Sequence, residues 1–146
     1  MGSRFYSCRY KKLVCHALRV VSLMDTSNKG DFRRKIKTRE KLLAIIGPWP
    51  HKKSVIMCHG AFDIVHPGHL RHLMYAKSKA DILVASLTCD AHISKANYRP
   101  FVPEELRAIN LAALEIIDYV IIDSNPTPIE NIRFLQPDYF AKGYEY

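Results

Sequence analysis

Residues 55–90 read VIMCHGAFDIVHPGHLRHLMYAKSKADILVASLTCD, and this stretch decides the fold. The apolar run at 55–58 predicts a short buried strand, and DILVASL at 81–87 predicts a second one. The segment between them, 67–79, predicts a helix because apolar residues recur along one of its faces: Leu70, Leu73, Met74 and Ala76. Strand, helix and a further apolar strand are the repeating unit of a parallel sheet.

The same alternation continues outward from this stretch. Further helices are predicted at 39–46, ended by Gly47, at 103–117, opened by Pro103 with Glu104 and Glu105, and from Thr127 and Pro128 to about 135. Further strands are predicted at 119–122 and 138–142. We therefore expect an α/β fold with a doubly wound, Rossmann-like parallel sheet that is covered by helices on both faces.

The residues after the first strand are where such a sheet binds ligands, because sites lie at the carboxyl ends of its strands. Gly60 lets the chain turn off the strand, and His66-Pro67-Gly68-His69 opens the next helix. A helix N-terminus attracts phosphate, and imidazoles three residues apart share one side of the helix. Gly68 removes a side chain that would shield the backbone. The pattern favours phosphate chemistry.

Other interpretations of these histidines stay open at this point. A histidine near a helix start is often a cap or a surface residue, and His72 is expected to be a surface residue. The HxxH spacing could also supply half of a zinc site, but no third ligand has a suitable local spacing.

The segment GAFDIVHPGHL at 60–70 resembles the HxGH signature of the cytidylyltransferase-like nucleotidyltransferases, which share motif and fold type with class I aminoacyl-tRNA synthetases. The resemblance covers roughly 38–146 and continues through SLTCD at 86–90, RPFVPEELRAINLAALEIIDYVI at 99–121 and QPDYFAKGYEY at 136–146. The chain looks most like the sugar-phosphate adenylyltransferases, such as the heptose-phosphate type joined to ribokinase-like kinases. Glycerol-phosphate and ethanolamine-phosphate cytidylyltransferases are similar but fit 99–146 less well.

The resemblance also implies roles for individual residues. His66 and His69 would stabilise charge on the phosphate under attack, with Lys95 as a third catalytic residue. The nucleotide would be bound by Gly60, Ala61, Phe62, Gly68, Arg99 and Arg107. Asp63 would contact a magnesium ion. Without the resemblance, Lys95, Arg99 and Arg107 would be interpreted as solvated charges.

The implied reaction is transfer of a nucleotidyl group from an NTP, ATP or CTP, to a sugar phosphate or similar phosphomonoester. Pyrophosphate leaves and Mg²⁺ assists. The family's fifth strand and its Ser/Thr-Arg-rich motif are absent up to Tyr146, so we expect a C-terminally incomplete domain and a poor enzyme. The alternatives are a truncated, inactive nucleotide-binding homologue and a synthetase-like fragment acting on tRNA.

Charge is concentrated at the N-terminus. Residues 1–37 hold ten Lys/Arg and two Asp, whereas 38–146 holds twelve basic and twelve acidic residues. The domain at 38–146 is therefore neutral, which argues against nucleic acid as a partner. Residues 1–37 are expected to form a disordered basic extension, with a weak likeness to an organellar transit peptide.

Apolar content and cysteine usage indicate in which compartment the protein is expected. No run of about 18 apolar residues exists, so no membrane span is expected. None of the four cysteines forms a CxxC pair, which favours small buried residues in a reducing, cytoplasmic compartment. An exposed sheet edge would invite a homodimer.

Overall fold

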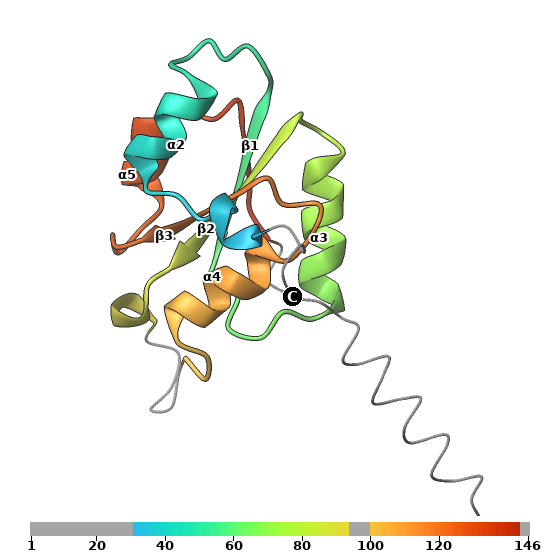
Figure 1. Cartoon of the computed structure of the whole chain (residues 1–146), viewed down its shortest axis with the longest axis vertical. Helices are drawn as coiled ribbons and strands as arrows, with labels where there is room; N and C mark the ends of the chain where they lie inside the picture. Colours follow the sequence, from blue (N-terminus) through green and yellow to red (C-terminus); the bar gives the residue numbers. More distant parts are fainter. Residues whose placement is uncertain (1–30, 94–99, 144–146) are drawn as a thin grey trace, which may run out of the picture. The chain divides into compact units, whose positions relative to one another are not determined.

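The computed structural model describes residues 31–93 and 100–143, and its fold lies in a compact unit that begins at Phe32. Figure 1 shows strands alternating with helices along this unit. The elements in chain order are η2 (Phe32–Lys35), α2 (Arg39–Ile46), β1 (Val55–Gly60), α3 (Pro67–Lys77), β2 (Ile82–Thr88), η3 (Asp90–His92), α4 (Glu104–Ala112), β3 (Tyr119–Asp123), α5 (Ile129–Leu135) and β4 (Tyr139–Ala141).

The described strands form one parallel sheet in the order β3-β2-β1-β4. The chain moves from β1 to β2 to β3 in one direction and then returns to the other side of β1 with β4. The strand order therefore reverses between β1 and β4, which is where doubly wound sheets bind their ligands. This topology confirms the predicted α/β, Rossmann-like fold and places the carboxyl end of β1 at the switch point.

Two apolar layers cover the sheet, one on each face (Figure 1). On one face α3 and α4 pack against the strands through Leu73, Ala76, Ala108, Leu111 and Ala112. On the other face α2 and α5 pack through Leu42, Ile46 and Leu135. Strands buried on both faces explain why the sequence shows continuous apolar runs and not an alternating pattern.

The helix predicted at 103–117 is shorter in the structure and ends at Ala112. The backbone then turns, with the amide of Ile117 donating to the carbonyl of Leu114. The same Leu114 carbonyl accepts a hydrogen bond from Lys35 Nζ at 2.9 Å. The Leu114 carbonyl thus accepts both a backbone amide from the turn and a side chain from the N-terminal segment, which links that segment to the end of α4. The predicted N-cap Thr127 is also displaced, because Pro128 occupies the cap position of α5.

The N-terminal boundary lies earlier than the expected residue 38. Phe32–Lys35 forms a 3-10 helix, Ile36 makes a parallel bridge with Val120 and packs on the core, and the amide of Lys37 donates to the Val120 carbonyl at 2.9 Å. From the sequence, we placed this segment in the charged extension because it is rich in basic residues. The structure shows that it belongs to the fold. The fold therefore includes at least six residues that we expected to be outside it.

Two deletions should separate the extension from the fold. Removal of residues 1–31 is expected to leave the melting temperature almost unchanged. Removal of residues 1–37 also deletes the backbone bond to Val120 and the Lys35 bond to Leu114, and should cost roughly 1–3 kcal/mol of unfolding free energy. Chemical denaturation of the two shortened chains measures the difference, and equal stabilities would contradict this placement.

Among the described residues, no helix is long and apolar enough to cross a membrane. Two of the four cysteines, Cys58 and Cys89, fall in the described part, and both are buried free thiols. Burial raises the pKa of Cys58 to about 12, so its thiol is unreactive at neutral pH.

Candidate active site

The loop after β1 leaves the sheet through an unusual backbone conformation. Phe62 is buried and has a φ of 46°, in the left-handed region that few non-glycine residues adopt. Its ring lies against Gly60, where an added Cβ would come within 3.3 Å of it. The Phe62 ring also packs on the imidazole of His69, with 5.2 Å between ring centroids. Strained backbone of this kind persists where surrounding contacts fix it, often at functional sites.

His66 and His69 cap the N-terminus of α3 reciprocally. His66 is the N-cap residue, and its Nδ1 accepts a hydrogen bond from the amide of Gly68 at 3.1 Å. The amide of His66 in turn donates to Nδ1 of His69 at 3.4 Å, and the ring centroids are 4.0 Å apart. When Nδ1 of a neutral imidazole accepts, its proton lies on Nε2. The capping geometry therefore presents Nε2–H of each ring as a donor.

The structure gives a different explanation for the glycine at position 68 from the one that we expected. Its amide is already bonded to His66, so it does not serve as a bare backbone donor. A Cβ at this position would lie 2.8 Å from Cε1 and 3.0 Å from Nδ1 of His66. The glycine is therefore required by the imidazole beside it, because any side chain would push that ring out of its capping position.

The environment of His69 favours its neutral form. Burial beside Phe62 lowers the pKa of His69 below 6.5, and the nearby charges of His66 and His72 lower it further, while the Ile64 carbonyl opposes the shift. At neutral pH the ring is thus an uncharged hydrogen-bond donor. His72 lies on the same helix and has no role in the capping contacts.

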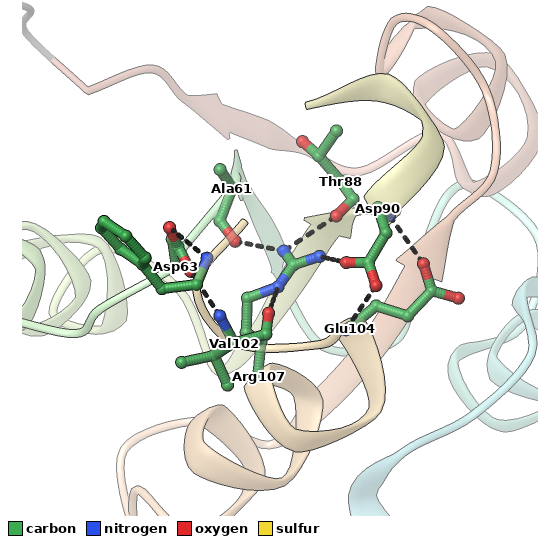
Figure 2. Close-up of polar contacts among 8 residues, drawn as sticks. Ala61, Asp63, Thr88, Asp90, Val102, Glu104 and Arg107 are labelled. Carbon is green, nitrogen blue, oxygen red and sulfur yellow. Dashed lines mark hydrogen bonds and ion pairs between the residues drawn. The ribbon is translucent and has the colours of Figure 1, made fainter. Parts of the chain in front are cut away.

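Arg107 is not a solvated charge in this structure, and its position differs from the expected nucleotide contact. The side chain is completely buried, and its guanidinium donates to the carbonyls of Ala61, Thr88 and Val102 and to the carboxylate of Asp90. Figure 2 shows these partners converging from the loops after β1 and β2 and from the start of α4. Arg107 therefore binds the protein's own backbone.

Asp63 likewise has protein partners in place of the expected metal ion. Its two carboxylate oxygens accept the amides of Phe101 and Val102, each at 3.0 Å (Figure 2). No group of three His, Cys, Asp or Glu residues suitable for a metal occurs within 31–93 and 100–143. As described, Asp63 fits a loop anchor and does not fit a magnesium ligand.

The expected phosphate-binding residues Lys95 and Arg99 lie outside the described residues. The structure therefore brings together six of the ten expected positions at the first-strand loop and the start of α3: Gly60, Ala61, Phe62, His66, Gly68 and His69. Arg107 and Asp63 make their contacts with the protein backbone: Arg107 bonds the carbonyl of Ala61 in this loop, and Asp63 joins the loop to the start of α4.

Sequence reasoning missed a polar cluster at the carboxyl ends of the three neighbouring strands. His59 Nδ1 lies 3.0 Å from Ser86 Oγ, and its Nε2 lies 3.1 Å from Thr88 Oγ1. The buried carboxylate of Asp123 is 3.8 Å from the same imidazole. The sequence did contain a feature that could have predicted this cluster. Each apolar run ends with polar residues, as in VIMCHG, ILVASLT and YVIID.

His59 should make the fold sensitive to acid. Burial lowers the pKa of His59 below 6.5 in the folded protein, and Asp123 only partly opposes this. The unfolded chain then binds protons more readily, so stability is full above about pH 6.5 and falls as the pH drops below it. Melting temperatures from pH 7.5 to 5 should fall less steeply in His59→Asn than in the wild type, and parallel curves would contradict this.

Comparisons with known proteins show which sequences this chain resembles. The bifunctional protein HldE of Campylobacter jejuni is 40% identical over 121 residues, which are 82% of this chain and 26% of that protein. HldE of Helicobacter acinonychis is 42% identical over 114 residues, 77% of this chain and 24% of that protein. The chain thus spans about a quarter of the length of these curated relatives.

A solved structure shares the fold, and a family model covers the site. The lipopolysaccharide core biosynthesis protein from Thermoplasma volcanium superposes with a TM-score of 0.56 at 25% identity, over 60% of this chain and 72% of that one. The sequence model of the cytidylyltransferase-like family matches residues 57–146, which include the His66–His69 turn. With more than half of its length matched, the chain belongs to the cytidylyltransferase-like family of nucleotidyltransferases.

Proposed function

We propose that this chain transfers a nucleotidyl group from ATP or CTP to the phosphate of a sugar phosphate or similar phosphomonoester. The observation that carries the proposal is the reciprocal capping of His66 and His69 at the start of α3, directly after β1. It fixes two imidazole donors side by side at the positive end of a helix, beside the switch point of the sheet. The resemblance to sugar-phosphate adenylyltransferases is what supports a sugar phosphate as acceptor.

The proposed reaction is an in-line displacement at the α-phosphorus. An oxygen of the acceptor phosphate forms the new P–O bond, the bond between the α-phosphorus and the bridging oxygen breaks, and pyrophosphate leaves with that electron pair. Nε2–H of His66 and His69 would donate to the phosphate oxygens as negative charge builds on them. Donors held in place before the reaction stabilise this charge without reorganising, which is the largest catalytic contribution expected here.

No step is assigned to a metal ion, because Asp63 does not fit a ligand in this structure. Mg²⁺ enters the proposal only as the companion of the NTP phosphates, which it ordinarily binds with few protein ligands. When bound it would offset charge on the leaving pyrophosphate. Lys95 and Arg99 remain proposed phosphate contacts on the strength of the family resemblance alone.

A two-substrate assay tests the function. The chain is incubated with each of the four NTPs and with phosphomonoesters of aldoses, heptoses, glycerol and ethanolamine, and pyrophosphate is measured. Release that requires both an NTP and an acceptor supports the proposal and identifies both substrates. Nucleotide binding by calorimetry without any release would favour the inactive binding homologue. Release that requires tRNA would overturn the proposal in favour of a synthetase-like activity.

A further inference from the structure

A closed circuit of hydrogen bonds, formed by Arg107, Val102, Asp63 and Ala61, lies next to the candidate site (Figure 2). Arg107 Nε donates to the Val102 carbonyl at 2.8 Å, and the Val102 amide donates to Asp63 Oδ1 at 3.0 Å. Asp63 lies two residues after Ala61, whose carbonyl accepts from Arg107 Nη1. The circuit therefore joins the loop after β1 to the start of α4.

The same guanidinium also bonds the last residue of β2, Thr88, and Asp90 just after it. Arg107 Nη1 donates to the Thr88 carbonyl at 2.9 Å, and Nη2 forms an ion pair with Asp90. Asp90 and Glu104 then bond each other's amides, at 2.7 Å from Asp90 N to Glu104 Oε2 and 3.2 Å from Glu104 N to Asp90 Oδ2. One buried side chain thus ties three segments that are far apart in the sequence.

The contact with Ala61 has a direct consequence for the site. A peptide group is planar, so fixing the Ala61 carbonyl also fixes the Phe62 amide, which points away from Arg107. The same peptide precedes the left-handed conformation of Phe62, which neighbouring contacts must hold in place. The ring of Phe62 in turn packs against His69. A continuous chain of contacts therefore leads from the guanidinium to the imidazole.

We propose that Arg107 is a positioning residue for the reaction, which holds the Ala61–Phe62 peptide so that Phe62 keeps His69 in place. This inference rests on the proposed function, and it assigns Arg107 a role without contact to either substrate. Its guanidinium is completely buried and donates to three carbonyls and one carboxylate of the protein. Few of its five N–H groups remain for a ligand.

Arg107→Met and Arg107→Lys test the role, with Arg133→Met as matched control, because Arg133 is exposed and pairs only with the exposed Glu130 within the described contacts. NMR titration of the His69 imidazole is the readout that needs no substrate. In Arg107→Met the pKa of His69 should rise toward 6.5, since loss of the Phe62 contact exposes the ring. Arg107→Lys should fall between this variant and the wild type, and Arg133→Met should match the wild type.

Kinetics distinguish positioning from nucleotide binding. Arg107→Met should lower kcat about 10- to 100-fold while the KM for NTP changes little, as expected for small misplacement of a reacting group. A large rise in the KM for NTP with an unmoved His69 titration would assign Arg107 to the nucleotide and overturn the inference. A lower melting temperature with unchanged kcat and His69 titration would make it a purely structural residue and overturn it as well.

Asp63→Asn keeps the test decisive if Arg107→Met does not fold. It removes one of the two accepting oxygens, because Phe101 N and Val102 N bond different carboxylate oxygens of Asp63 and asparagine has an NH2 donor in place of one of them. The His69 titration should move in the same direction, and no movement would overturn the inference. If the wild type releases no pyrophosphate with any substrate pair, the proposed function fails, while the His69 titration still decides whether Arg107 controls the position of the ring.

Discussion

Replacement of His69 by alanine is expected to lower turnover about 100-fold or more, with little loss of stability. The expectation follows from the proposed role of the imidazole as a fixed donor to the phosphate under attack, since removal of one such donor typically costs this much. His69 is half-buried, and its removal loses only the packing on Phe62 and the long 3.4 Å hydrogen bond from the His66 amide, so the loss of stability should be small.

His66 requires a second substitution, because this residue is also the N-cap of α3. His66→Ala should lower turnover by a similar factor and also cost about 1 kcal/mol of stability through loss of the cap. His66→Asn should recover the stability, since asparagine is a good N-cap, but it should not recover turnover. Pyrophosphate release and thermal denaturation, measured on the same samples, separate the two effects.

The matched control for both histidines is His72→Ala, which makes the same chemical change on the same helix. Turnover in this variant should stay within about twofold of the wild type, because His72, which is half-buried and not at the surface as expected, makes none of the capping contacts. If His69→Ala retained near-normal turnover, or if His72→Ala lost as much, the proposed assignment of the capping pair would be wrong.

The fold was predictable because its strands are buried on both faces. Apolar runs such as residues 81–87 fit strands that are covered in this way. Of the predicted apolar face of the helix between the first two strands, Leu73 and Ala76 are buried, whereas Met74 is exposed. The site turn was predictable for a similar local reason. The histidines, the proline and the glycine that shape it are neighbours in the sequence, so no long-range contact had to be inferred.

The role of Arg107 was not predictable from the sequence, because its partners come from three separate segments. Ala61 lies 46 residues before it and Thr88 lies 19 residues before it. These carbonyls meet only when the carboxyl ends of β1 and β2 lie side by side. From the sequence, an arginine in an amphipathic helix is therefore interpreted as a surface charge or a ligand contact. Only the folded sheet shows that this arginine is buried and links the ends of two strands.

Gly68 has a different structural role from the one that we expected. We expected it to expose the backbone to phosphate, but its amide bonds to His66, and the space beside it is filled by that imidazole. The signature HxGH then reflects a packing requirement between the first histidine and the glycine. This difference leads to a test in which the two explanations give opposite results.

Gly68→Ala is expected to lower turnover nearly as much as His66→Ala, about 100-fold, because the new Cβ would lie 2.8 Å from Cε1 of His66 and displace the ring. The substitution introduces no other strain, since alanine is favourable within a helix and Gly68 does not have a positive φ. The double variant His66→Ala/Gly68→Ala removes the atom that the Cβ would meet. It should therefore show the same turnover as His66→Ala alone and be at least as stable.

Such a double-mutant cycle measures the coupling between the two positions directly. If Gly68 acts only by making room for the imidazole, the coupling should be almost as large as the effect of either single substitution, because both remove the same donor. If Gly68 instead exposes its backbone to phosphate, the effects should add, and the double variant should be slower than His66→Ala by the full cost of Gly68→Ala. Additive losses in pyrophosphate release would therefore restore the original explanation of the glycine, because the shielding of the backbone would persist when the imidazole is absent.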